Sequence, residues 1–399
     1  MHPTLRDIDV TANPLVAALI PALSEPAALV GGVVRDLLLG LPSGTDVDVV
    51  VEGDGVRVAR EVADRLDATL RTHGRFGTAV MTVPGHEGHV DFVTARRETY
   101  DRPNALPRIE PAHLADDLAR RDFSINALAV WLSGPGAGTL VDPTGGLADL
   151  DARRLRLLRA HGFVEDTSRL VRAARYAGRL GFHLDTATAA EAVRAAPTLD
   201  WSNPRTALEL LRLLRESDPV PGLLLLREFG APGLRADLSE GVVAIDAAAA
   251  TPGAPAIDAW VLRLGVVCER DALHAVALPE SAVRAALDMA EGLGVARHLM
   301  TDADRPSERD AALGRTPPSA QIAALAAGAG DVAVWWREAR DLRLGIGGSD
   351  LIADGATPGP HLGRALAAAR AAMLDGTAPT TAEQRAVALA SLGLDDGAH

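Results

Sequence analysis

Two aspartates one residue apart are the side chains of this sequence best placed to do chemistry. Asp46 and Asp48 lie in the segment DVDVVV, and side chains two positions apart point to the same face of a β-strand. Both carboxylates can therefore reach one site, and such oxygen ligands suit Mg²⁺. Asp91, in HVDFVT, could complete the site as a third ligand or as a base. The same pattern also occurs in solvated turns, so the pair needs support from its surroundings.

Residues suited to phosphate binding lie before and after the aspartates. Gly31 and Gly32 precede a predicted helix, where bare backbone N–H groups can hold a phosphate, and Arg35 falls on its first turn. In RRDFSINA, Arg121 is a candidate ribose or phosphate contact that Asp122 could orient. A tightly packed turn and ordinary edge charges are the alternatives. Together these residues favour nucleotidyl transfer, in which two Mg²⁺ ions about 3.5–4 Å apart activate a hydroxyl and stabilise the leaving pyrophosphate.

A further row of charged side chains recurs every three residues along one predicted helix. It consists of Asp166, Arg169, Arg172 and Arg175, and such spacing also describes an ordinary salt-bridged surface. A carboxylate can accept a hydrogen bond from the amino group of cytosine or adenine, and a neighbouring guanidinium can donate to the ring. Uracil and guanine present an oxygen at the corresponding position of the base, and this oxygen would repel a carboxylate. An unpaired polar group costs about 1–3 kcal/mol, or roughly 10- to 100-fold discrimination, so Asp166 and Arg169 could select C and A without a template.

The elements that must position these residues change in character along the chain. Apolar runs predict strands and helices in the first part, and amphipathic helices replace the strands after about residue 150. A Gly/Pro-rich segment, 133–146, is the predicted boundary. We therefore expect an α+β fold with a small mixed-sheet head and an all-helical remainder. The predicted strands lie within 27–32, 46–53, 76–85 and 89–98, and the predicted helices include 33–41, 56–68, 167–182, 186–196 and 204–216.

Composition narrows the class of protein. The 399 residues allow two or more domains, and no apolar run is long enough to span a bilayer. The first residues lack the pattern of a signal peptide, and the single cysteine, Cys268, excludes an intrachain disulfide. We therefore expect a cytoplasmic protein. The net charge of −13 argues against nonspecific nucleic-acid coating, but all 40 basic residues are arginine, whose planar fork suits phosphate and base edges.

The order of these motifs resembles that of the bacterial class II tRNA nucleotidyltransferases, which are the CCA-adding enzymes, together with the related A-adding enzymes and bacterial poly(A) polymerases. The resemblance is dense over 29–215 and recurs over 345–370. The segments that carry it are LVGGVVRDLLLG, DVDVVVEGD, RFGTAV, RRDFSINALAV, LVDPTGGLADL, EDTSRLVRAARYAGRLGF, NPRTALELLRLL and GGSDLIADGATPGPHLGRAL.

This resemblance implies a polymerase-β-like nucleotidyltransferase head at 1–145, a helical neck at 146–220, a body at 221–340 and a tail at 341–399. Asp46 and Asp48 would bind Mg²⁺, and Gly32 and Arg35 would hold the nucleotide's phosphates. The LVDPTGG segment would be a hinge, and the body and tail would hold the acceptor arm of tRNA. The incoming ATP or CTP would be contacted by Arg121, Asp166, Arg169, Arg172 and Arg175, with Asp166 and Arg169 reading its base.

The identity of the added nucleotide stays open between two predictions. The long segment at 95–119 favours use of ATP, because this loop is shortened in members that add only C. Full CCA addition and addition of the terminal A alone, beside a separate CC-adding enzyme, are both compatible with it. A poly(A) polymerase of the same family is a further alternative. A non-catalytic tRNA-binding protein is the alternative from another class, and the intact Asp46, Asp48 and Arg169 argue against it.

Overall fold

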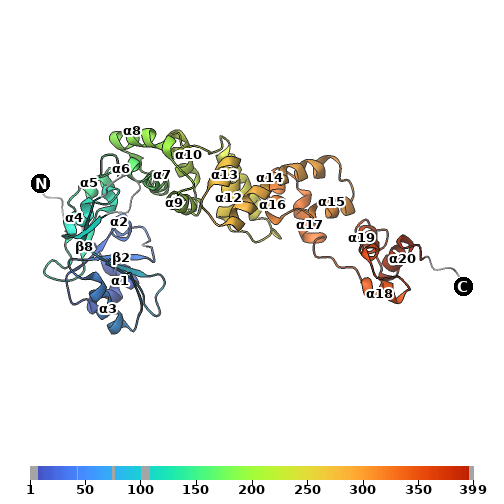
Figure 1. The fold of residues 1–399 in the computed structure, drawn as a ribbon, viewed down its shortest axis with the longest axis horizontal. Helices are drawn as coiled ribbons and strands as arrows, with labels where there is room; N and C mark the ends of the chain where they lie inside the picture. The colour runs from blue at the N-terminus through green and yellow to red at the C-terminus, as the bar shows by residue number, and fades with distance from the viewer. Residues whose placement is uncertain (1–7, 43, 74–76, 100–107, 395–399) are drawn as a thin grey trace. The chain divides into compact units, whose positions relative to one another are not determined.

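The computed structural model describes residues 8–42, 44–73, 77–99 and 108–394. The chain divides into two units (Figure 1). The first contains the chain up to Asp200 together with Glu216–Pro232, and the second contains Trp201–Arg215 together with the chain from Gly233 onward. Within the described ranges, no helix combines the length and apolar character needed to cross a membrane.

A mixed sheet forms the core of the first unit, with strand order β3-β4-β5-β2-β1-β8-β9. Strands β2 and β5 run parallel, whereas the other neighbours are antiparallel. The predicted mixed-sheet head is therefore confirmed. The strands are β1 (Ala27–Val30), β2 (Val47–Val51), β3 (Thr69–His73), β4 (Thr78–Thr82), β5 (Val90–Thr94), β8 (Ala129–Trp131) and β9 (Leu140–Val141).

Valine-rich sequence places β2 at the centre of this sheet. Val47, Val49, Val50 and Val51 are at most 1% exposed, as expected for a strand covered on both faces. Helix α3 (Gly55–Leu66) follows it and begins where the side chain of Asp54 accepts a hydrogen bond from the backbone of Arg57. The remaining head elements are α1 (Pro14–Leu19), α2 (Gly32–Leu38), α4 (Leu114–Ala119), the 3₁₀ turn Ser124–Asn126, and a separate hairpin of β6 (Arg96–Thr99) and β7 (Arg108–Pro111).

Helices make up most of the remainder of the first unit. Helix α7 packs against α10, and a Cβ atom added to Gly178 would lie 2.6 Å from the backbone nitrogen of Gly222. The glycines therefore allow the two backbones to approach closely. A two-residue parallel pair, β10 with β11, departs from the all-helical prediction, because such short strands carry no periodic signal. These elements are α5 (Gly146–Asp151), β10 (Arg154–Leu155), α6 (Gly162–Glu165), α7 (Ser168–Leu180), β11 (His183–Leu184), α8 (Thr186–Ala195) and α10 (Val220–Glu228).

The described part of the second unit is built of helices. Its largest interface is between α14 and α16, where a Cβ atom on Gly292 would lie 2.5 Å from the carbonyl oxygen of Ala320. This agrees with the predicted helical remainder, while its division into body and tail stays a prediction. The helices are α9 (Pro204–Leu214), α11 (Leu238–Ala249), α12 (Ala259–Val267), α13 (Arg270–Ala275), α14 (Glu280–Thr301), α15 (Pro306–Leu313), α16 (Pro318–Ala326), α17 (Asp331–Glu338), α18 (Gly348–Ala353), α19 (Pro360–Leu374) and α20 (Thr381–Ser391).

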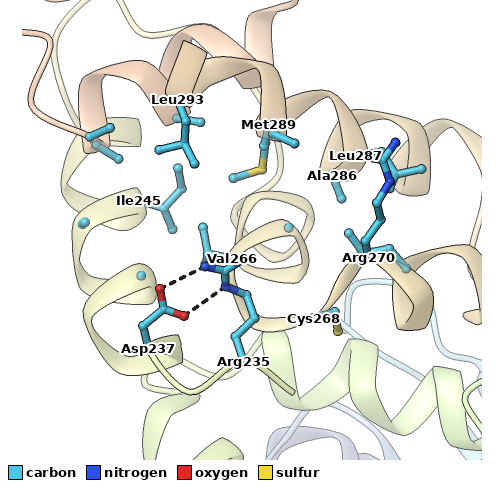
Figure 2. Close-up of a pocket in the computed structure, with 18 of the residues that line it drawn as sticks. Arg235, Asp237, Ile245, Val266, Cys268, Arg270, Ala286, Leu287, Met289 and Leu293 are labelled. Carbon is cyan, nitrogen blue, oxygen red and sulfur yellow. Dashed lines mark hydrogen bonds and ion pairs between the residues drawn. The ribbon is translucent and has the colours of Figure 1, made fainter. Parts of the chain in front are cut away.

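An open, mainly apolar hollow of about 390 Å³ lies among α11, α12, α14 and α16 (Figure 2). Small and flexible side chains such as Met289 line it, and the ion pair of Arg235 with Asp237 lies at one edge. Cys268 also borders the hollow. Burial raises the pKa of its thiol to about 12, so this cysteine is a small buried hydrophobe and a poor nucleophile.

Candidate active site

Three acidic residues predicted to act together are brought to the same end of two neighbouring inner strands of the sheet. Asp48 lies on β2 and Asp91 on β5, and their Cα atoms are direct partners in the parallel register. Asp46 stands immediately before β2, with its side chain 67% exposed. Pairing of β2 with β5 begins at Val47, directly after Asp46.

His89 connects two of these carboxylates, and the sequence analysis did not identify it. Its Nδ1 lies 2.8 Å from Oδ1 of Asp46, and its Nε2 lies 3.5 Å from Oδ2 of Asp91. The backbone oxygen of His89 also accepts a hydrogen bond of 2.9 Å from the backbone nitrogen of Val47. His89 precedes Asp91 by two residues, just as Asp46 precedes Asp48, so both members of each pair point to the same face. This spacing is a sequence signal that could have identified His89 as part of the site.

The negative charge of the cluster is only partly compensated. Asp48 keeps contact with solvent, but the surrounding protein raises its pKa by desolvation; Arg121 lowers it, while Asp91 and Asp46 raise it further. The pKa of Asp91 is also raised, again first by burial, with His89 opposing the shift and Asp46 adding to it. Crowded carboxylates of this kind favour a bound cation. Among the described residues, no three ligating side chains already converge on a single point.

Gly31 allows the chain to turn tightly beside the carboxylates. Its φ is +79° and its ψ is −137°, a conformation that L residues rarely adopt. A Cβ atom here would lie 3.0 Å from Nη1 of Arg121 and 3.5 Å from Oδ2 of Asp48. Arg121 therefore lies against the predicted phosphate turn, and the predicted metal ligand Asp48 approaches the same glycine. Its Nε is buried without a hydrogen-bond partner among the described residues, and its Nη2 donates to Asp117 over 3.3 Å.

Arg35 lies deeper than a phosphate ligand at the surface would. It is 2% exposed, its Nε donates to Asp36 over 2.9 Å, and its Nη1 donates to Asn126. Gly32 begins α2 beside it, and a Cβ atom there would lie 3.4 Å from Nη2 of Arg35. Contact between Arg35 and a triphosphate stays a prediction. The guanidinium as placed here anchors α2 to the segment that follows Arg121.

Asp122 joins this segment to helix α7. Its carboxylate lies 2.8 Å from Nη2 of Arg172 and accepts hydrogen bonds from Asn126 and from the backbone of Phe123. Burial alone would raise the pKa of Asp122, but Arg172 and these hydrogen bonds outweigh it and lower the pKa overall. Asp122 therefore orients Arg172, and the predicted orientation of Arg121 by Asp122 stays a prediction.

The remaining members of the charged row are held by contacts with other parts of the first unit. Asp166 accepts a hydrogen bond of 3.1 Å from the backbone of Ser168 at the start of α7. Nη1 of Arg169 donates to the carbonyl oxygen of Gly162 over 3.2 Å, and Arg175 donates to Glu216 over 3.1 Å. The base-reading role of Asp166 and Arg169 stays a prediction.

The predicted hinge segment is densely bonded. Asp142 accepts hydrogen bonds of 2.8 and 3.0 Å from the backbone nitrogens of Gly146 and Leu147. Asp149, which is fully buried, accepts from Arg154 over 2.7 Å and from Arg156 over 2.8 Å. These contacts fix α5 to the chain on both sides of it, and the hinge motion remains a prediction.

Comparison with known proteins gives a consistent result. Residues 27–156 match the poly A polymerase head domain. A CC-adding tRNA nucleotidyltransferase from Deinococcus radiodurans is 34% identical over 368 residues, which is 92% of this chain and 89% of that protein. An A-adding tRNA nucleotidyltransferase from Geobacter sulfurreducens is 42% identical over 212 residues, which is 52% of this chain and 24% of that protein. A solved CCA-adding enzyme in an apo form matches with a TM-score of 0.81 and 25% identity, over 96% of this chain and 97% of that one.

The extent of these matches differs between the two activities. The chain spans about a quarter to a half of the length of the A-adding relatives that it matches, whereas it spans most of the CC-adding relative. The predicted family and fold are confirmed by these similarities. The chain therefore belongs to the tRNA nucleotidyltransferase family, and its residues 27–156 match the poly A polymerase head domain.

Proposed function

We propose that this protein adds nucleotides to the 3′ end of tRNA without a template, using ATP or CTP. One observation carries the proposal: neighbouring residues lead from the carboxylate cluster to the arginine-bearing helix. Arg121 and Asp48 both lie beside Gly31, and the next residue, Asp122, pairs with Arg172 on α7. A triphosphate at the carboxylates would thus have its base directed toward side chains of α7. Side chains and no pairing strand would then choose the nucleotide.

The residues divide into those that serve the reacting phosphate and those that serve the base. Asp46 and Asp48 would hold Mg²⁺, and Asp91 would act as a third ligand or as the base. The bound ion would supply positive charge that polarises the α-phosphate and favours ionisation of the tRNA hydroxyl. Arg121 and the backbone at Gly31 would hold the triphosphate.

Selection of the base would use α7 and the residues just before it. Asp166 would accept a hydrogen bond from the amino group of adenine or cytosine, and Arg169 would donate to the ring. Both side chains already bond to neighbouring backbone, so a nucleotide would exchange existing hydrogen bonds for new ones. The helical second unit would hold the acceptor arm of tRNA.

The added nucleotide is the finer part of this proposal. Sequence identity to A-adding relatives reaches 42%, but the match covers only about half of this chain. The match to a CC-adding relative covers 92% of this chain. The predicted ATP-favouring segment, 95–119, begins with β6 and ends with β7 and α4, and residues 100–107 lie outside the described part. Addition of CC is therefore a third candidate beside CCA and A alone.

The test supplies purified protein and Mg²⁺ with three tRNAs, which lack CCA, end in C or end in CC, and adds each nucleoside triphosphate singly. Growth of CC-ended tRNA by one A identifies terminal A addition. Growth by C alone identifies CC addition, and both together identify CCA addition. Long tails on unrelated RNA would instead identify a poly(A) polymerase. If no RNA is extended, the proposed activity is wrong.

Asp46→Ala separates the chemical step from tRNA binding. We expect loss of incorporation, because one of the two predicted metal ligands is gone, with little change in tRNA affinity measured by filter binding. Asp54→Ala, at the cap of α3, is a control that removes an acidic residue beyond the opposite end of β2, away from the cluster. Incorporation at the wild-type rate by Asp46→Ala would remove Asp46 from the metal site.

A further inference from the structure

One tyrosine in the first unit is surrounded by arginines. The ring of Tyr176, on α7, is 9% exposed. The guanidinium carbons of four arginines lie between 4.6 and 5.8 Å from its centroid, which is within cation–π range. Three come from α7 itself and one comes from α2 in the head. They are Arg35 at 5.0 Å, Arg172 at 5.8 Å, Arg175 at 4.6 Å and Arg179 at 5.6 Å.

The arginines around this ring belong to the two predicted halves of the nucleotide site. Arg35 follows the phosphate turn at Gly31 and Gly32, whereas Arg172 and Arg175 belong to the charged row of α7. Phe123, from the segment that carries Arg121, meets the Tyr176 ring edge-on, with centroids 6.0 Å apart and planes at 86°. The Tyr176 ring thus contacts side chains from α2, from α7 and from the segment Arg120–Phe123, which is called the RRD segment below.

The four guanidiniums around the ring face three acids. Asp36 lies 2.8 Å from Arg35 and 3.8 Å from Arg179, while Asp122 pairs with Arg172 and Glu216 with Arg175. Burial would raise the pKa of the Tyr176 phenol, but Arg172 and Arg175 outweigh burial and lower the pKa overall. The acids thus offset only part of the repulsion among the guanidiniums. The negative face of the aromatic ring reduces this repulsion and keeps the cations together.

We infer that Tyr176 is a positioning residue for nucleotide selection, because its ring holds the arginines of α2 and α7 in one fixed cluster against the RRD segment. The inference rests on the proposed function. It predicts that loss of the ring loosens the relation between the phosphate-binding and base-reading groups. Binding and discrimination should then suffer more than the rate of the chemical step at saturation, since the carboxylate cluster does not touch this ring.

The test compares three variants of the full chain. Tyr176→Leu removes the ring, and Tyr176→Phe keeps it and removes only the hydroxyl. Phe163→Leu is the matched control. Phe163 is a fully buried aromatic residue that packs on Phe123, as Tyr176 does, with ring centroids 6.4 Å apart. KM, kcat and the preference over UTP and GTP are measured with ATP and with CTP on tRNA, and thermal unfolding is followed in parallel.

We expect Tyr176→Leu to raise KM about tenfold and to lower the preference over UTP and GTP by a similar factor, with kcat changed less than threefold. Tyr176→Phe should stay within about threefold of wild type. Phe163→Leu should lose similar thermal stability yet keep its discrimination. Unchanged KM and discrimination in Tyr176→Leu, or equal losses in Phe163→Leu, would overturn the inference alone. An inactive wild-type protein would overturn the proposed function and, with it, this role of Tyr176.

Discussion

Replacing Gly31 by alanine tests the geometry of the candidate site most directly. With φ at +79° and ψ at −137°, an alanine would be held in a region that costs about 1–3 kcal/mol for a residue with a Cβ atom. The new methyl group would also lie 3.0 Å from Nη1 of Arg121, so this guanidinium must move by a few tenths of an ångström. Because Arg121 and Asp48 both lie beside Gly31, we expect kcat/KM to fall at least about tenfold in addition to the loss of stability.

Alanine substitutions at two nearby glycines, Gly40 and Gly32, distinguish the backbone strain from the contact with Arg121. Gly40 has φ at +67° and no atom within 4 Å of an added Cβ, so Gly40→Ala carries a backbone cost of about 1 kcal/mol without a contact in the site. Gly32 has an ordinary φ, and an added Cβ would lie 3.4 Å from Nη2 of Arg35. Gly32→Ala should therefore change stability by less than about 1 kcal/mol.

The assay combines guanidinium unfolding of each variant with steady-state incorporation on tRNA. Gly31→Ala should lose both stability and activity, and Gly40→Ala should lose stability while its activity per folded molecule is retained. If Gly31→Ala keeps wild-type kcat/KM, the close approach of Gly31 to Arg121 and Asp48 has no role in the reaction. If Gly40→Ala loses as much activity as Gly31→Ala, backbone strain alone explains the effect.

Three further predictions concern other parts of the molecule. His89→Ala should tighten Mn²⁺ binding several-fold, measured by electron paramagnetic resonance, because Asp46 loses its imidazole partner; unchanged affinity would show that this contact does not compete with the ion. Asp149→Asn should destabilise the protein by about 1–3 kcal/mol at neutral pH. Burial would raise the pKa of Asp149, but its hydrogen bonds outweigh burial, so the pKa is lowered overall. The stability difference between Asp149→Asn and wild type should therefore shrink as pH falls below about 4. A stability difference independent of pH would contradict this. Arg263→Met breaks a pair with Asp246 in which Arg263 is 9% exposed and should cost about 2–3 kcal/mol in guanidinium unfolding. The exposed pair of Arg284 provides the control, and Arg284→Met should cost less than about 1 kcal/mol.

Local patterns in the sequence were sufficient for the features that depend on neighbours along the chain. Valine-rich β2 and the amphipathic period of α7 were predicted because burial imposes those periods on strands and helices. The pairing of Asp48 with Asp91 agrees with the expectation that both serve one site, although the parallel register that joins them is not a local property.

Features that depend on tertiary contacts were not predicted. His89 reaches Asp46 only because β5 lies beside β2. The burial of the Arg35 guanidinium against Asn126, which is far away in sequence, was not predicted. Tyr176 was not among the residues predicted to act, and only the approach of α2 to α7 brings Arg35 to its ring.

The parallel pairing of β2 with β5 has a consequence for how the molecule reaches its native state. The chain between these strands forms α3 and the hairpin of β3 and β4, so Asp48 and Asp91 meet only when this long segment is closed. Closing so long a loop makes this step slower than the formation of local hairpins. During refolding, regain of secondary structure should therefore precede regain of catalysis, and a newly synthesised chain that ends before β5 lacks the third acidic residue of the cluster, Asp91.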